Sequence, residues 1–136
     1  MNLILCLDDN GGLSFFSRRQ SMDSVLREKA LELAGGQKLW MDGYSAGQFQ
    51  NAPERIAVTQ EPLAEIGPED WFFLELQDWK PLLSEVRRLA VFHWNREYPS
   101  NRVFPLQQVL ANAKLLHRED FPGSSHENIT LEVYQL

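Results

Sequence analysis

The sequence has a single cysteine and no apolar run of membrane length, and each shortage excludes a class of protein. Cys6 cannot form an internal disulfide, and its place in an apolar stretch predicts a buried structural thiol. No apolar run approaches the ~20 residues that span a bilayer. Asp8 and Asp9 interrupt the first apolar stretch too early for a signal peptide. We therefore expect a cytoplasmic protein with no membrane segment.

Basic residues are also scarce, which limits the partners that the protein can have. Lysines and arginines number 13 against 19 acidic residues, so the formal net charge is −6. A grip on nucleic acid needs a basic face, and we expect none. No cysteine or histidine spacing resembles a metal site, and the apolar surroundings of His93 and His117 favour packed or paired side chains over metal ligands. The length predicts one domain, residues 1–136.

The most unusual residues of the chain gather between Asn10 and Asp23. This segment follows the apolar run Asn2 to Asp8, which is typical of a central strand, and it ends where helical spacing begins. It contains two glycines, two phenylalanines and the pair Arg18 and Arg19. A long strand-to-helix loop with these side chains indicates a site for a ligand that is anionic and partly flat.

Helices and strands alternate along the chain. Ser21 is expected to cap a helix that Gly35 and Gly36 end, because apolar residues recur every three or four positions between them. Asp78 opens a short helix, and the segment Leu106 to Ala113 is either one or two helical turns or irregular. The expected strands are Asn2 to Asp8, Lys38 to Met41, Ile56 to Thr59, Trp71 to Leu76, Leu89 to Trp94, Leu115 to Glu119 and Ile129 to Gln135.

This order of elements predicts an α/β fold of three layers. The central sheet is mainly parallel and flanked by helices, with a C-terminal antiparallel hairpin. A right-handed crossover should place Lys38 to Met41 in parallel beside the first strand. Ligands of such sheets bind beyond the carboxyl ends of the strands. We expect three polar segments there: Asn10 to Asp23, Asp42 to Ser45, and Glu75 to Asp78.

Short motifs in this order resemble those of the dihydrofolate reductase-like superfamily, at reduced length. Met1 to Leu13 is similar to its first strand and mobile substrate loop, and Lys38 to Ser45 is similar to its strand and phosphate-binding turn. Arg88 to Trp94 with Val103-Phe104-Pro105 resembles its late strand and Phe-Pro pair, and the tail from Lys114 resembles its closing hairpin. The resemblance implies that fold and a small reductase that uses NADPH to reduce a pterin- or flavin-like ring.

The resemblance also implies roles for individual residues. Asp23 would be the catalytic carboxylate that orients the heterocycle, under a loop that closes to exclude water. The substrate would contact Leu7, Phe16 and Gln20. The cofactor would contact Gly43, Tyr44, Ser45, Arg18 and Arg19.

Two departures from the family pattern support an alternative function. Glu75 to Gln77 stands where the family carries glycines that admit the cofactor phosphates, and Asp42 to Ser45 lacks the arginine of the family's turn. The added carboxylate should impair phosphate binding, unless Arg18 or Arg19 replaces the missing cation. The alternative is a catalytically silent descendant of the fold that binds a small anionic ligand or a protein partner through these arginines. Separately, a homodimer is a possible assembly of this chain.

Each candidate site also has a structural interpretation. Asp23 is either a ligand contact or an acid that stabilises the first turn of its helix. Arg18 and Arg19 are either an anion clamp or a solvated pair. The stretch Gly123 to Glu127 contains Ser124, Ser125 and His126, which is compatible with a hydrolytic site or with ordinary turn chemistry.

Overall fold

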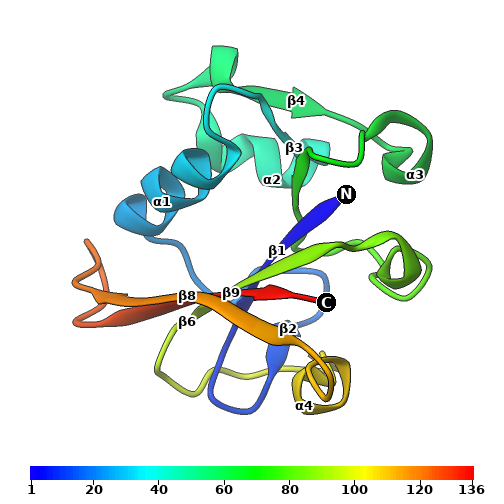
Figure 1. The fold of residues 1–136 in the computed structure, drawn as a ribbon. Coiled ribbons are helices and arrows are strands. Elements are labelled where there is room, and N and C mark those ends of the chain that lie inside the picture. Colours follow the sequence, from blue (N-terminus) through cyan, green and yellow to red (C-terminus); the bar gives the residue numbers. More distant parts are fainter.

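The computed structural model describes residues 1–136 and contains a seven-stranded sheet with β1 at its centre (Figure 1). In spatial order the strands are β4 (Ile56–Val58), β3 (Leu39–Met41), β5 (Trp71–Phe73), β1 (Asn2–Leu7), β6 (Arg88–His93), β9 (Ile129–Gln135) and β8 (Lys114–Phe121). The first five strands pair in parallel, and β9 pairs antiparallel with both β6 and β8. The expected α/β fold with a C-terminal antiparallel hairpin is confirmed.

Helices are short except for the first one. The α-helices are α1 (Ser24–Ala34), α2 (Gly43–Ala46), α3 (Pro62–Glu65) and α4 (Leu106–Val109). Three single 3₁₀ turns are η1 (Gly47–Phe49), η2 (Pro53–Arg55) and η3 (Leu83–Glu85). None of these helices combines the length and the apolar character that crossing a membrane requires.

The sheet separates two apolar cores, and this explains why β1 has a continuous apolar sequence. Ile4 faces one core, in which α1 packs, whereas Leu3 and Leu5 face the other, in which the η3 segment and α4 pack. Both faces of β1 are therefore covered, as expected for a central parallel strand. Figure 1 shows α1 and α4 on opposite sides of the strands.

The expected pairing of β1 with β3 is wrong. Both strands are parallel, but β5 lies between them and pairs with each, through Leu3 and Phe72 on one side and Trp40 and Phe72 on the other. The crossover through α1 leaves room for one strand, and a later segment of the chain occupies it. Nothing in the order of elements distinguishes a crossover to the next position from one that skips a position.

The start of α1 also differs from the expectation. Asp23 caps the helix, with its carboxylate accepting hydrogen bonds from the N–H groups of Val25 and Leu26, and the helix begins at Ser24. Ser21 lies two residues too early, and its hydroxyl contacts His126 instead. Asp and Ser are comparable N-caps, so local sequence did not separate the two.

Other limits of the elements shift by a few residues. β5 ends at Phe73, three residues before the expected end, and the helix expected after Asp78 is the 3₁₀ turn η3. The segment between Thr59 and Trp71, for which no helix was expected, contains the single turn α3. The strand expected over Leu115 to Glu119 extends in both directions, to Lys114 and Phe121.

Candidate functional site

The loop between β1 and α1 is a small hairpin. It contains β2 (Gly12–Ser14), which pairs antiparallel with β7 (Arg102–Val103), and Ser14 forms an isolated bridge with Arg19. The two strands were not expected, because each is only two or three residues long. Their pairing fixes the loop against the segment that follows β6.

A strained turn forms the tip of this hairpin. Phe15 and Arg18 exchange two backbone hydrogen bonds of 2.9 and 3.1 Å, and the residues between them, Phe16 and Ser17, have φ of 46° and 61°. Left-handed backbone costs about 1–2 kcal/mol for each non-glycine residue. The turn places Phe16, which is 68% exposed, and the Arg18 side chain in solvent.

Arg19 connects the hairpin to the residues at the carboxyl ends of the neighbouring parallel strands, which form one rim of the sheet. Its Nε donates to the two carboxylate oxygens of Glu75 at 3.0 and 3.2 Å, and its Nη2 donates to one of them at 3.1 Å. The guanidinium lies 4.2 Å from the ring centre of Tyr44, whose hydroxyl accepts the Arg19 N–H at 3.0 Å. The expectation that the loop and the turn Asp42 to Ser45 meet at one edge of the sheet therefore agrees with the geometry.

Glu75 is the centre of this cluster. It follows β5, its side chain is 7% exposed, and it accepts hydrogen bonds from Ser45 Oγ at 2.8 Å and Gln48 Nε2 at 2.9 Å in addition to those from Arg19. Burial, with the negative charge of Glu75, raises the pKa of the Cys6 thiol well above its usual value. A buried carboxylate with this set of donors is compensated from within the protein.

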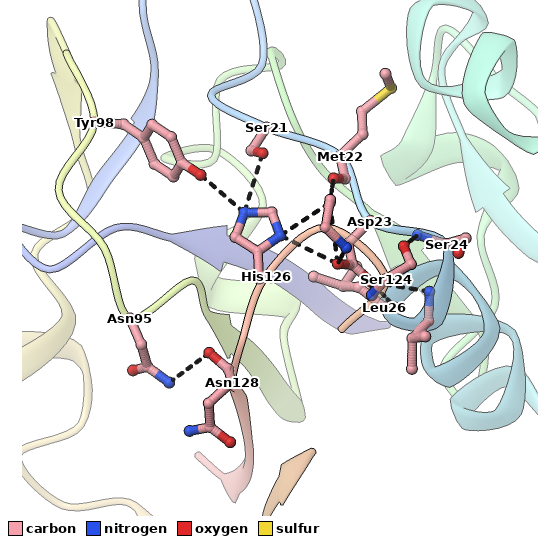
Figure 2. A network of polar contacts seen from close by, with 12 residues as sticks. Ser21, Met22, Asp23, Ser24, Leu26, Asn95, Tyr98, Ser124, His126 and Asn128 are labelled. Atoms are coloured by element: carbon pink, nitrogen blue, oxygen red, sulfur yellow. Dashed lines mark hydrogen bonds and ion pairs between the residues drawn. The ribbon is translucent and has the colours of Figure 1, made fainter. Parts of the chain in front are cut away.

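A second buried carboxylate, Asp23, joins α1 to the loop between β8 and β9 (Figure 2). Besides its two helix-capping bonds, it accepts the N–H groups of Ser124 at 3.1 Å and Ser125 at 2.9 Å. Its side chain is completely buried. The glycine before these serines, Gly123, leaves no room for a side chain, because a Cβ there would clash with the Asp23 carboxylate.

His126 extends this network on the other side of the loop (Figure 2). Its Nδ1 lies 3.1 Å from Asp23 Oδ2, and its Nε2 lies 2.8 Å from the Tyr98 hydroxyl and 3.2 Å from Ser21 Oγ. The imidazole is buried and stacks on Trp94 with the ring centres 4.6 Å apart. The ring is therefore held on both nitrogens and on one face.

Hydrogen bonds determine the ionisation of Asp23. Burial alone would raise its pKa, but the N–H groups of Ser125 and Ser124, His126 and the Leu26 N–H outweigh burial and hold the pKa well below its usual value. The carboxylate is therefore charged at neutral pH and accepts hydrogen bonds from the N–H groups of Val25, Leu26, Ser124 and Ser125.

Two cavities lie near these clusters. One of about 450 Å³ adjoins His126 and is lined by Trp94, Asn95, Arg96, Ser125, His126, Glu127 and Asn128. The other, of about 260 Å³, adjoins the hairpin tip and is lined by Ser14, Phe16, Ser17, Leu76, Asn101 and Arg102. Ligand pockets in proteins have volumes of about 300–1,000 Å³, so the first cavity has the size of a small-molecule site.

The residues with expected roles fall into two groups. Arg19 and Ser45 bond to Glu75, and Tyr44 contacts Arg19. The other candidates lie elsewhere: Arg18 projects from the tip, Phe16 borders the smaller cavity, Gly43 is exposed at the start of α2, Leu7 is buried in the second core and Asp23 is buried next to His126. Gln20 donates weakly to Pro99 O at 3.5 Å, and its Oε1 is buried without a partner. Their roles in catalysis and binding stay predictions.

Ser124 and Ser125, in the loop between β8 and β9, do not form the hydrolytic site that the sequence allowed. Ser125 Oγ lies on the Nδ1 side of His126, which Asp23 also occupies, and it donates to Met22 O at 2.8 Å. Ser124 Oγ accepts the Ser24 N–H at 2.9 Å. Both hydroxyls hold the loop against the start of α1 and are not placed for attack on a substrate.

Several functional candidates had no signal in the sequence. Gln48, Tyr98 and Trp94 acquire their positions only because distant segments meet, since Tyr98 and His126 are 28 residues apart and Gln48 and Glu75 are 27 apart. The Ser-Ser-His-Glu stretch was the one local indication of this region.

No family model and no curated protein matches this sequence. Among solved structures, the chain is similar to dihydrofolate reductase from Enterococcus faecalis, complexed with NADP(H) and RAB-propyl. The match has a TM-score of 0.67 and covers 98% of this chain and 94% of that one, with 12% sequence identity. A likeness at this level of identity is informative about the fold alone. Together with the order of its strands, it shows that this chain has a dihydrofolate reductase-like fold.

Proposed function

We propose that this protein is a binding protein of dihydrofolate reductase-like fold, which takes up a small ligand with a carboxylate or phosphate group and does not use a nicotinamide cofactor. The observation that carries the proposal is Glu75, buried at the carboxyl end of β5 and bonded to Arg19, Ser45 and Gln48. The proposal takes residues 1–136 as one domain, because both apolar cores share the same sheet.

The charge of Glu75 opposes a phosphate in this place. Two like charges 4 Å apart repel by about 4 kcal/mol at the effective dielectric constant of a protein surface. Arg19 and Ser45, which the resemblance assigns to the cofactor, already bind Glu75. These residues do not fit a cofactor phosphate unless the ion pair is first broken, and breaking a buried pair is costly.

The second candidate function is a reductase that uses NADPH and a pterin- or flavin-like substrate. It is favoured by the similar solved structure, which is a dihydrofolate reductase complexed with NADP(H). In that case Arg18 and Arg19 would bind cofactor phosphate, and Asp23 would have to give up protein hydrogen bonds to reach a substrate. Both requirements run against the observed contacts, so we rank this function second.

Calorimetric titration with NADPH and NADP⁺ separates the two functions. We expect no saturable binding to the natural sequence at millimolar cofactor. Glu75→Gln, which removes the charge but keeps the shape, should admit the cofactor better than the natural protein does. Glu69→Gln is the matched control, because it makes the same change of charge at an exposed residue paired with Arg87. Saturable binding of NADPH by the natural sequence would refute the first proposal and support the second.

Uptake of a small oxyanion is tested separately by thermal shift against a panel of carboxylates and phosphates. A compound that binds the folded state raises the melting temperature in proportion to the logarithm of its concentration above Kd. A panel without any stabilising compound would count against the binding function.

A further inference from the structure

The larger cavity lies where ligands of this fold class are expected. It adjoins the carboxyl end of β6, the neighbour of the central strand β1, between the segment Trp94–Arg96 and the loop Ser125–Asn128. Parallel sheets bind ligands beyond the carboxyl ends of their strands, near the position where the chain order reverses. The chain leaves β1 toward β3 and β5 on one side and later returns to form β6 on the other. This cavity lies one strand from that reversal, between the carboxyl end of β6 and the start of β9.

Arg96 supplies an uncompensated positive charge at the cavity. Its side chain is exposed and forms no ion pair, and its guanidinium lies 5.5 Å from the ring centre of Tyr98. Arg19 differs in this respect, because Glu75 neutralises it. In a protein of net charge −6, a free guanidinium beside a cavity favours a carboxylate or phosphate, which it can bind with two parallel hydrogen bonds.

The walls of the cavity are held in place before any ligand arrives. Asn95 has a left-handed backbone with φ of 59°, and its side-chain amide donates to Asn128 O at 3.2 Å and to Thr130 Oγ1 at 3.0 Å. These bonds join the two sides of the cavity, as Figure 2 shows for Asn95 and Asn128. Strained backbone that is fixed by its neighbours is typical of functional sites.

Trp94 and His126 form the inner wall. They stack on each other, and both nitrogens of the imidazole are bonded to protein groups. A wall that cannot rearrange reduces the entropy lost when a ligand binds. Glu127 is the only acid on the lining, and it provides an acceptor for an amino or hydroxyl group of the same ligand.

We infer that this cavity is the binding site for a small molecule that carries a carboxylate or phosphate together with a hydrogen-bond donor. Arg96 binds the oxyanion, while Glu127 and the amides of Asn95 and Asn128 bind the donor groups. This inference rests on the proposed function and gives it a site other than the Arg18 and Arg19 loop.

The test is a titration followed by NMR of the backbone amides, the tryptophan indoles and the side-chain amides. The probes are glutamate, inorganic phosphate and adenosine monophosphate, which separate a carboxylate ligand from a phosphate or nucleotide ligand. We expect saturable shifts of the Trp94 indole and of the Asn95 and Asn128 side-chain amides with at least one probe at millimolar concentrations.

Three variants of two arginines locate the site. Arg96→Ala should weaken the binding about tenfold or more, since it removes a charge-assisted hydrogen-bonding pair. Arg96→Lys should recover only part of the loss, because lysine lacks the planar fork. Arg18→Ala makes the same change of charge at the hairpin tip and should leave the affinity unchanged. Both arginine side chains are exposed in the natural protein, so all three variants should fold.

The outcomes distinguish the inference from the proposed function. Saturable binding that Arg18→Ala weakens and Arg96→Ala does not would overturn the cavity assignment and leave the binding function intact. Shifts confined to Phe16 and Asn101 would do the same. Absence of saturable shifts with all three probes would count against both.

Discussion

Replacing Asp23 by asparagine tests how far one carboxylate holds the molecule together. The substitution preserves the size of the side chain and one acceptor oxygen, and asparagine is as good an N-cap as aspartate. The second oxygen becomes an NH₂ group that faces the Ser125 N–H at the place where Oδ2 now accepts it. Asparagine should therefore still cap α1, but the hydrogen bond from the Ser125 N–H in the loop between β8 and β9 should be lost.

The expected loss follows from the bonds on that oxygen. Oδ2 accepts the Ser125 N–H at 2.9 Å and faces His126 Nδ1 at 3.1 Å. Hydrogen bonds to a charged partner contribute about 1.5–3 kcal/mol each, so Asp23→Asn should lower the free energy of unfolding by about 3 kcal/mol. For a chain of this size that is a fall of roughly 10 °C in Tm.

The loss should depend on pH in a definite direction. Hydrogen bonds hold the pKa of folded Asp23 below the value of about 3.9 that an unfolded aspartate has. A carboxylate whose pKa is lower in the folded than in the unfolded state stabilises the folded protein fully at pH values above the unfolded pKa. This stabilisation is lost as the pH falls from the unfolded pKa through the folded pKa. The difference between the natural protein and Asp23→Asn should therefore be constant near neutrality and shrink below about pH 4.

Urea unfolding at neutral and acidic pH measures both effects. Asp42→Asn is the matched control, since the Asp42 carboxylate caps α2 and accepts one hydrogen bond of 2.9 Å from the Ser45 N–H. This substitution should lower the free energy of unfolding by less than about 1 kcal/mol. A difference for Asp23→Asn no larger than for Asp42→Asn would refute the reasoning, as would a difference that stays the same in acid.

Three further predictions concern packing and titration. Gly123→Ala should lower the free energy of unfolding by about 1–3 kcal/mol, because the added Cβ meets the Asp23 carboxylate, while Gly43→Ala, which meets open space, should be tolerated; equal effects in urea unfolding would contradict this. Ultraviolet titration should show one tyrosine ionising late, since burial and Glu132 raise the pKa of Tyr134 to about 12, and Tyr134→Phe should remove that step. Thiol reagents should label Cys6 slowly in the folded protein and rapidly in urea, because burial raises its pKa; equal rates would refute the assignment.

The parts of the fold that the sequence predicts are those with a strong local pattern. The continuous apolar run of β1 and the three-and-four spacing of α1 each carry their own signal. The closing hairpin was predicted because β8 and β9 are adjacent in the chain, separated by one polar loop. In these elements the tertiary structure adds burial to a preference that is already present.

Elements whose pairing depends on distant partners could not be predicted. β2 and β7 have three and two residues, and their pairing joins Gly12 to Val103. The place of β5 between β1 and β3 is likewise a property of the assembled sheet. A strand of this length has no periodicity to detect, and its stability comes from neighbours that are far away in sequence.

In the candidate site, too, only the features with a signal in the order of elements could be predicted. The meeting of the loop with the turn Asp42 to Ser45 could be predicted, because the carboxyl ends of parallel strands share an edge. The ion pair between Arg19 and Glu75 was not predicted, because local sequence carries no signal for a contact between residues 56 positions apart.

Asp23 and Glu75 together constrain what the rim can recognise. Each is a buried carboxylate whose oxygens are already bonded to protein donors, Asp23 to backbone N–H groups and His126, and Glu75 to Arg19 and its neighbours. If a carboxylate oxygen of Asp23 or Glu75 bound a ligand instead, the protein donors that it now pairs with would be left unpaired. This would cost about 1–3 kcal/mol for each donor. Recognition is less costly through groups that are uncommitted, such as Arg18 and Arg96, which are exposed and form no ion pair. Of the two, only Arg96 borders a cavity large enough to surround a ligand, so selectivity should reside at the end of β6 while the buried carboxylates maintain the frame.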